Sequence, residues 1–161
     1  MSQSGFVNLS REKILEFEAE LKELKTTGRK QMAERIAEAR SYGDLSENAE
    51  YDAAKEAQGL LELKISKLEE MLSKARIIDT SNLPSDIVHI LTTVTIKNLN
   101  NGKTLKYTMV SLEEADLQSG KLAITSPVGQ ALMNKKKGDI VEVKVPAGLI
   151  KYEILELEQS A

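Results

Sequence analysis

The sequence has no cysteine among its 161 residues. This absence excludes disulfides, zinc–thiolate sites and thiol nucleophiles, and it fits a reducing compartment. No run approaches the roughly 20 apolar residues that a membrane-spanning helix needs. The opening residues, MSQSGFVNLSREK, also lack the apolar core of a secretion signal. We therefore expect a soluble protein of the cytoplasm that does not contact a membrane.

The sequence also has only one histidine and a small net charge. The single histidine, His89, lies in the apolar stretch DIVHIL without a Cys, His or carboxylate at ligand spacing, which predicts a structural role. No Ser–His–Asp order, Walker motif or glycine-rich dinucleotide turn occurs. A formal net charge of −3 argues against broad binding to duplex nucleic acid, which requires a basic surface. Any functional charge must therefore form a small patch.

Two helical segments with heptad spacing fill the first half of the chain. The first begins after Ser10, a favourable N-cap, and its apolar stripe is interrupted at Gly28. The second carries a seam of about three heptads. The two stripes consist of Ile14, Phe17, Leu21, Leu24, Met32, Ile36 and Ala39 in the first segment, and of Ala54, Gln58, Leu61, Ile65, Leu68, Leu72 and Ala75 in the second. Together they predict an antiparallel coiled-coil hairpin over residues 1–78.

The periodicity changes after a turn-rich stretch, DTSNLPSD, at residues 79–86. Its proline blocks a continuing helix, so we interpret it as a linker. Residues 87–161 then alternate as strands do, with a hairpin signal at Asn101-Gly102 and one short helix in SPVGQALMN. The predicted fold class is α+β with two domains, a helical hairpin and a small antiparallel β-sheet domain that carries one short helix.

The loop between the two helices holds the stretch YGDLSENAEY, in which Asp44 and Glu47 stand three positions apart. One interpretation is a capping box, with Asp44 as the N-cap of the second helix and Glu47 at its third position. The other treats both carboxylates as ligands of Mg²⁺, with the remaining ligands supplied by phosphates of another macromolecule. Spacing alone favours the capping box. Arg40 and Lys55 add positive charge nearby, which is typical of solvated coiled-coil faces but also suits RNA phosphate.

The stretch IAEARSYGDLSENAEYDAAKEAQG resembles the hairpin tip of the bacterial Gre transcript cleavage factors, closest to the GreA type. The segments LTTVTIKNL, ITSPVGQALMNKKKGDIVEVKVPAG and YEILEL resemble the C-terminal domain of that family in the same order. The resemblance implies a coiled coil followed by an FKBP-like α+β domain. It further implies that the coiled coil enters the secondary channel of RNA polymerase, where the protein is not an enzyme but stimulates the polymerase's own cleavage of backtracked nascent RNA.

The resemblance also implies roles for individual residues. Asp44 and Glu47 would help to hold a Mg²⁺ ion shared with the polymerase active centre, and no cofactor would bind stably to the chain alone. The other implied sites are tip support by Ser46, Asn48 and Tyr51, contact with the RNA 3′ end by Arg40 and Lys55, and polymerase docking by Thr125, Ser126 and Pro127.

The sequence departs from the family pattern at two places. Asn134 stands where a glycine is frequent after the short helix, and GRKQM stands where many relatives have Arg-Pro. Neither departure touches the tip, and the unaltered GDLSE favours cleavage activity. A monomer is expected, because the hairpin satisfies its own seam.

Two alternative functions stay open at this point. An FKBP-like fold suggests a peptidyl-prolyl isomerase, but the only aromatic residues after position 85 are Tyr107 and Tyr152, and the isomerase pocket of that fold is lined with aromatics. A channel-binding regulator without a catalytic contribution, or a generic coiled-coil adaptor, would not need the tip carboxylates.

Overall fold

The structure is a computed structural model that describes residues 5–43 and 48–159. The chain divides into two compact units, Met1–Val7 with Arg11–Arg76 and Asn8–Ser10 with Ile77–Ala161. The predicted domain limits at residues 78 and 87 stay a prediction. None of the helices in the part that the structure describes is both long and apolar enough to cross a membrane.

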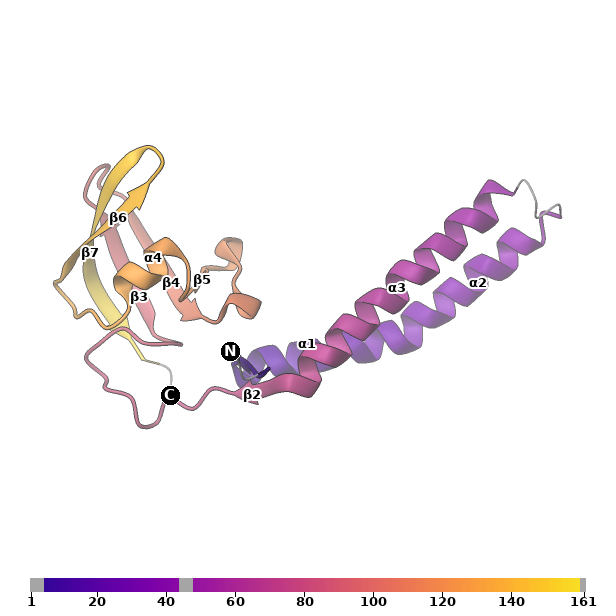
Figure 1. Cartoon of the computed structure of the whole chain (residues 1–161), viewed down its shortest axis with the longest axis horizontal. Coiled ribbons are helices and arrows are strands. Elements are labelled where there is room, and N and C mark those ends of the chain that lie inside the picture. The colour runs from indigo at the N-terminus through magenta and orange to yellow at the C-terminus, as the bar shows by residue number, and fades with distance from the viewer. Residues whose placement is uncertain (1–4, 44–47, 160–161) are drawn as a thin grey trace. The chain divides into compact units, whose positions relative to one another are not determined.

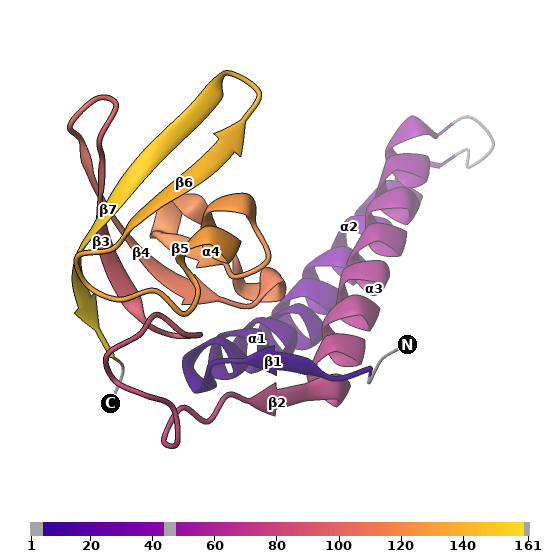
Figure 2. The same cartoon turned by 60° about the vertical axis from the view of Figure 1, so that its left-hand side comes forward.

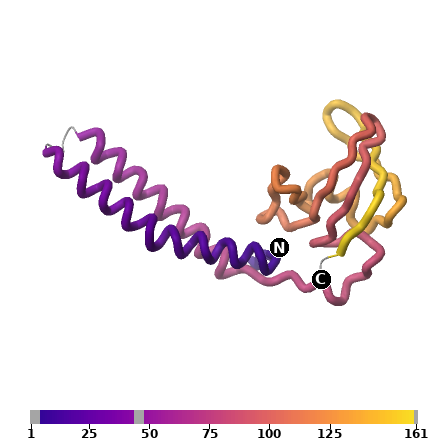
Figure 3. Tube along the Cα trace, turned by 180° about the vertical axis from the view of Figure 1, so that it is seen from behind, coloured from indigo at the N-terminus to yellow at the C-terminus, as the bar shows by residue number. Residues whose placement is uncertain are grey.

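The first unit is a hairpin of two helical arms (Figure 1). One arm runs through α1 (Arg11–Glu23), a π-helical turn (Leu24–Gly28) and α2 (Arg29–Arg40), and the other is α3 (Ala49–Lys74). Figure 3 follows the two arms side by side along the trace. The predicted antiparallel helical hairpin is therefore confirmed.

The seam of the hairpin follows the predicted stripes. Ala39, Ala54, Ile65 and Leu68 are buried, and every other stripe residue is partly buried. One residue differs from the prediction, because α3 ends at Lys74 and Ala75 lies in an extended conformation. It begins β2 (Ala75–Ile77), which pairs with β1 (Val7–Leu9) in a two-stranded sheet. Strands of three residues are too short to give a recognisable alternation in the sequence.

The interruption at Gly28 is the end of the π-helical turn. Leu24, Gly28 and Met32 are four residues apart, whereas an α-helix turns once in about 3.6 residues, so the stripe would drift off the seam. A wider turn absorbs the surplus residue. A Cβ atom at position 28 would lie 3.4 Å from a methyl carbon of Leu61, so the two arms approach closely here.

The second unit contains a five-stranded sheet with the order β5-β4-β3-β7-β6. The strands are β3 (Thr93–Asn98), β4 (Thr104–Val110), β5 (Lys121–Ala123), β6 (Ile140–Val145) and β7 (Gly148–Glu158). One short helix, α4 (Pro127–Leu132), packs against this sheet (Figure 2). The predicted α+β class is confirmed.

The sequence predicted an antiparallel sheet, but one pair of strands differs. β4 and β5 pair in parallel. Between them the chain passes through two 3₁₀ turns, Leu112–Glu114 and Leu117–Ser119, so β5 runs in the same direction as β4. The local pattern of KLAIT gives a strand but not its direction.

The core of this unit lies between the sheet and α4. Its fully buried side chains include Val88, Val94, Ile96, Met109, Leu132 and Ile154. His89 is also buried, and its Nδ1 lies 2.8 Å from the carbonyl oxygen of Ile90, which fits the predicted structural role.

A short N-terminal segment belongs to the same unit. Leu9 is fully buried, and its carbonyl accepts a hydrogen bond from the backbone N–H of Ile78 at 3.0 Å. Ser10 donates from its hydroxyl and its backbone N–H to the two carboxylate oxygens of Glu114, at 2.8 and 3.1 Å. The Glu114 side chain is only 2% exposed, and Lys121 lies 3.3 Å from it. A buried carboxylate is therefore matched by an ammonium group and two N–H or O–H donors, as burial of charge requires.

Candidate functional site

Three of the predicted tip residues, Asp44, Ser46 and Glu47, lie outside the described residues. The flanking residues are described on both sides. α2 ends at Arg40, and Gly43 has a φ of +100°, a left-handed conformation that glycine adopts without a steric penalty. α3 begins at Ala49.

Asn48 is the N-cap of α3. Its backbone is extended, with φ −87° and ψ 95°, and its side-chain oxygen accepts a hydrogen bond from the backbone N–H of Tyr51 at 3.1 Å. The prediction that Asp44 is the N-cap of this helix is therefore wrong. Asparagine caps as well as aspartate does, so the local preference did not separate the two positions.

The same asparagine also contacts the other helix. Its side-chain nitrogen donates to the backbone carbonyl oxygen of Ala39, in the last turn of α2, at 2.6 Å. Ala39 is buried, with 3% of its surface exposed. A single amide side chain thus joins the end of one arm to the start of the other.

A second contact between the arms involves two more predicted residues. The guanidinium carbon of Arg40 lies 5.6 Å from the centre of the Tyr51 ring, which is cation–π geometry. Lys55 does not take part, since its ammonium group donates to Gln58 at 3.1 Å on α3. The structure therefore brings Arg40, Asn48 and Tyr51 together, whereas the hydrogen bond of Lys55 is to Gln58 on its own helix.

Sequence reasoning missed two carboxylates near the tip. Glu38 and Glu50 line a small hollow of about 170 Å³, together with Arg35, Ala39 and Tyr42. The Tyr42 hydroxyl donates to Glu38 at 3.2 Å, and this bond raises the pKa of the phenol above its ordinary value. Both acids lie within the stretch that resembles the Gre hairpin tip, but that resemblance assigned no role to either. Among residues 5–43 and 48–159, no three His, Cys, Asp or Glu side chains gather as metal ligands.

The three predicted docking residues lie together where α4 begins. The Ser126 hydroxyl accepts from the backbone N–H of Gly129 at 3.0 Å, as the predicted N-cap would, and Pro127 is the first helical residue. The Thr125 carbonyl accepts from the Gln130 amide at 2.9 Å. Thr125 and Pro127 are exposed.

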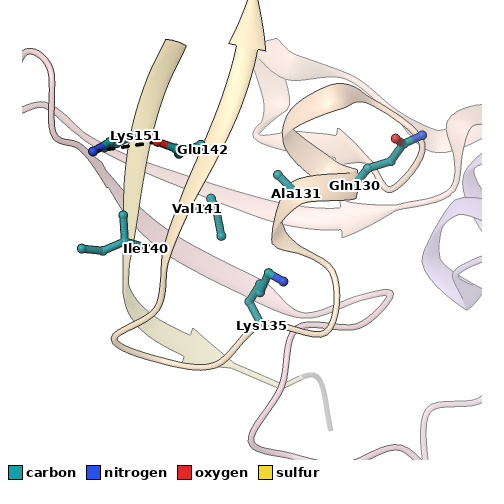
Figure 4. A pocket seen from close by; sticks show the side chains of 7 residues that line it. All are labelled: Gln130, Ala131, Lys135, Ile140, Val141, Glu142 and Lys151. Carbon is teal, nitrogen blue, oxygen red and sulfur yellow. Dashed lines mark ion pairs between the residues drawn. The ribbon is translucent and has the colours of Figure 1, made fainter.

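A shallow hollow of about 490 Å³ lies beside this segment, between α4 and the strands β6 and β7 (Figure 4). Lys151 and Glu142 form an ion pair across the two strands at 3.8 Å. None of the seven side chains lining the hollow is aromatic; they are Gln130, Ala131, Lys135, Ile140, Val141, Glu142 and Lys151. The hollow therefore lacks the aromatic walls expected of a proline-binding pocket.

Comparison with known proteins gives matches along most of the chain. Residues 7–77 match the family described as "Transcription elongation factor, N-terminal", and residues 83–159 match "Transcription elongation factor, GreA/GreB, C-term". The chain is 54% identical to transcription elongation factor GreA of Flavobacterium johnsoniae over 138 residues, which cover 86% of this chain and 87% of that protein.

Two further proteins are similar to the chain. Transcription elongation factor GreA of Amoebophilus asiaticus is 52% identical over 146 residues, covering 91% of this chain and 93% of that protein. The crystal structure of GreA factor homolog 1 of Thermus thermophilus aligns at 21% identity and a TM-score of 0.43, covering 95% of this chain and 99% of that one.

Proposed function

The chain belongs to the GreA/GreB family of transcription elongation factors, and on this premise we propose that it stimulates the cleavage of backtracked nascent RNA by RNA polymerase. In this proposal the helical hairpin enters the secondary channel of the polymerase and brings its tip to the RNA 3′ end. The factor is not an independent enzyme, because the bond-breaking machinery is that of the polymerase.

The observation that carries this proposal is the place of the acidic pair in the chain. Asp44 and Glu47 fall in the four residues between Gly43, just after α2, and Asn48, which caps α3. With 26 residues, α3 is about 39 Å long at a rise of 1.5 Å per residue. An arm of that length can reach a deep site that the globular unit could not enter.

The donor chemistry of the tip fits a shared magnesium ion. Carboxylate oxygens are the hard ligands that Mg²⁺ prefers, and Mg²⁺ commonly uses one or two carboxylates together with phosphate oxygens and water. Asp44 and Glu47 would supply the two carboxylates, and the polymerase and its RNA would supply the remaining ligands. A magnesium ion held in this way would activate a water molecule and stabilise the charge that develops on the phosphate.

The remaining predicted residues that the structure describes lie on the helices beside the tip or at the start of α4. Arg40 is exposed at the end of α2 and offers a cation to the RNA phosphates, while Tyr51 stacks on its guanidinium group. We assign polymerase docking to Thr125, Ser126 and Pro127, because two of them are exposed and the third fixes the first turn of α4.

The decisive experiment measures RNA cleavage in stalled, backtracked polymerase complexes. Asp44→Asn and Glu47→Gln should each bind polymerase normally and lose most of the stimulation, because an amide is a poor ligand for magnesium compared with a carboxylate. Glu23→Gln is the matched control, since it removes the same charge from an exposed position at the end of α1.

The stability of the hairpin separates this role from a structural one. Because α3 is capped by Asn48, both tip variants should keep the helicity and melting temperature of the wild type. If both variants stimulate cleavage as the wild type does, the carboxylates do not serve the reaction and the proposal fails.

A further inference from the structure

We infer that Asn48 is a positioning residue for the tip, whose side-chain amide holds the last turn of α2 to the start of α3. The inference rests on the proposed function. It begins with the two bonds of one amide, from Oδ1 to the N–H of Tyr51 and from Nδ2 to the carbonyl of Ala39.

The partners of the amide determine its orientation. One partner is a backbone N–H and can only donate, and the other is a backbone carbonyl and can only accept. The oxygen of Asn48 must therefore face Tyr51, and the nitrogen must face Ala39. The two bonds span three and nine positions in the sequence, so one caps a helix and the other joins two helices.

The two bonds make different demands on the residue type. Asparagine, aspartate and serine are about equally good N-caps. Aspartate, however, has no N–H to donate to a carbonyl, and serine offers one short hydroxyl that cannot serve both partners. Capping alone would accept any of the three. The bond to Ala39 requires asparagine, so the link between the arms is what specifies this position.

The packing near the tip explains why a polar link matters there. The buried seam residues closest to the tip are Ala39 and Ala54, which bury much less apolar surface than the Ile65 and Leu68 side chains farther down the hairpin. The arms are therefore held weakly by apolar contact at this end. The Asn48 bond and the stacking of Arg40 on Tyr51 supply the contacts that the alanines do not.

The link matters for the chemistry because magnesium coordination is strict. Its ligands must lie about 2.0–2.1 Å from the ion, and a misplacement of about 1 Å can cost on the order of 100-fold in rate. In the sequence, Asp44 and Glu47 lie between Ala39 and Asn48, the two residues that this bond joins. Losing the link should therefore lower the rate of the catalysed step rather than the affinity for polymerase.

The test replaces Asn48 with aspartate, which keeps the shape and the cap but removes the donor. Asn48→Ser is the second variant, since it also keeps the cap and adds no charge. Asn82→Asp is the matched control, because it makes the same chemical change at an exposed loop position. Each protein is titrated against backtracked complexes, and the maximal cleavage rate, the half-saturating factor concentration and the magnesium requirement are measured. Circular dichroism reports the helicity.

We expect Asn48→Asp and Asn48→Ser to lower the maximal rate by at least about tenfold and to raise the magnesium requirement, with unchanged half-saturation and helicity. A wild-type rate and magnesium requirement in either helical variant overturns the inference. So does a defect confined to the half-saturating concentration, which would mean a role in binding. The proposed function fails separately, if the wild type gives no stimulation or if Asp44→Asn retains it.

Discussion

Replacing Gly129 with alanine probes how closely α4 packs on the strand that precedes it. A Cβ atom at this position would lie 2.1 Å from the backbone oxygen of Ala123 and 2.9 Å from the hydroxyl oxygen of Ser126. Both atoms hold the start of the helix, because the Ser126 hydroxyl also donates to the Ala123 carbonyl at 2.7 Å. The added methyl group would therefore clash with the two atoms that form the helix cap.

The expected change in the free energy of unfolding is the sum of opposing contributions. The helix must move by about 1 Å to relieve the contact with Ala123, and overpacking of this kind costs about 1–3 kcal/mol. A weakened cap at Ser126 adds about 1 kcal/mol. The higher helix propensity of alanine returns about 1 kcal/mol. The net loss is about 2 kcal/mol, which lowers the melting temperature of a domain of this size by roughly 8–16 °C.

Gly59 provides the control for the same substitution. It is exposed within α3, and an added Cβ atom would meet no heavy atom within 4 Å. Gly59→Ala should therefore stabilise the hairpin by up to about 1 kcal/mol. Scanning calorimetry tests whether Gly129→Ala lowers the melting temperature and Gly59→Ala raises it. If Gly129→Ala melts at or above the temperature of the wild type, the close contact at Ala123 is no constraint and the reasoning is refuted.

Two further predictions concern single side chains. Asn134 has a left-handed φ of +68°, so Asn134→Gly should leave the melting temperature equal or slightly higher, whereas Asn134→Val should cost about 1–2 kcal/mol. The hydrogen bond from Tyr42 to Glu38, with the negative charge of that carboxylate, raises the pKa of the phenol. Glu38→Gln should therefore lower that pKa in an NMR titration. Because the folded pKa is the higher one, the stabilisation by this pair is present at neutral pH and is lost as pH rises through it.

The hairpin could be predicted because heptad spacing states directly which residues form the seam. The cap of α3 could not. Asp44, Ser46 and Asn48 are all good N-caps within five positions of one another. What favours Asn48 is its bond to Ala39 on the other arm. Local propensity does not depend on such a contact between arms, so it could not identify the cap.

In the second unit, too, features with a local sequence signal could be predicted, and features that depend on distant residues could not. The short helix was predictable, because Ser126 and Pro127 form a local start signal. The parallel pairing of β5 with β4 was not, since strand direction depends on the path of the intervening turns. The turn after α4 keeps its left-handed conformation even though Asn134 replaces a glycine, because asparagine tolerates that region better than most residues do.

The candidate site was predictable only in part. The acidic pair and Arg40 were found from the motif, and their roles stay predictions. The stacking of Arg40 on Tyr51 was not foreseen, because a basic residue on a coiled coil is usually a solvated charge. Glu38 and Glu50 escaped notice for a similar reason, since charged residues at helix ends are common in any hairpin.

The bond between Ser10 and Glu114 has a consequence for the order in which the chain folds during synthesis. The two residues are 104 positions apart, so Ser10 leaves the ribosome long before Glu114 does. The hairpin contacts lie within residues 11–76, so we expect the hairpin to close once α3 is made, whereas the bond of Ser10 requires Glu114 of the globular unit. We therefore expect Ser10 to reach its final place after the helical hairpin that follows it in the chain.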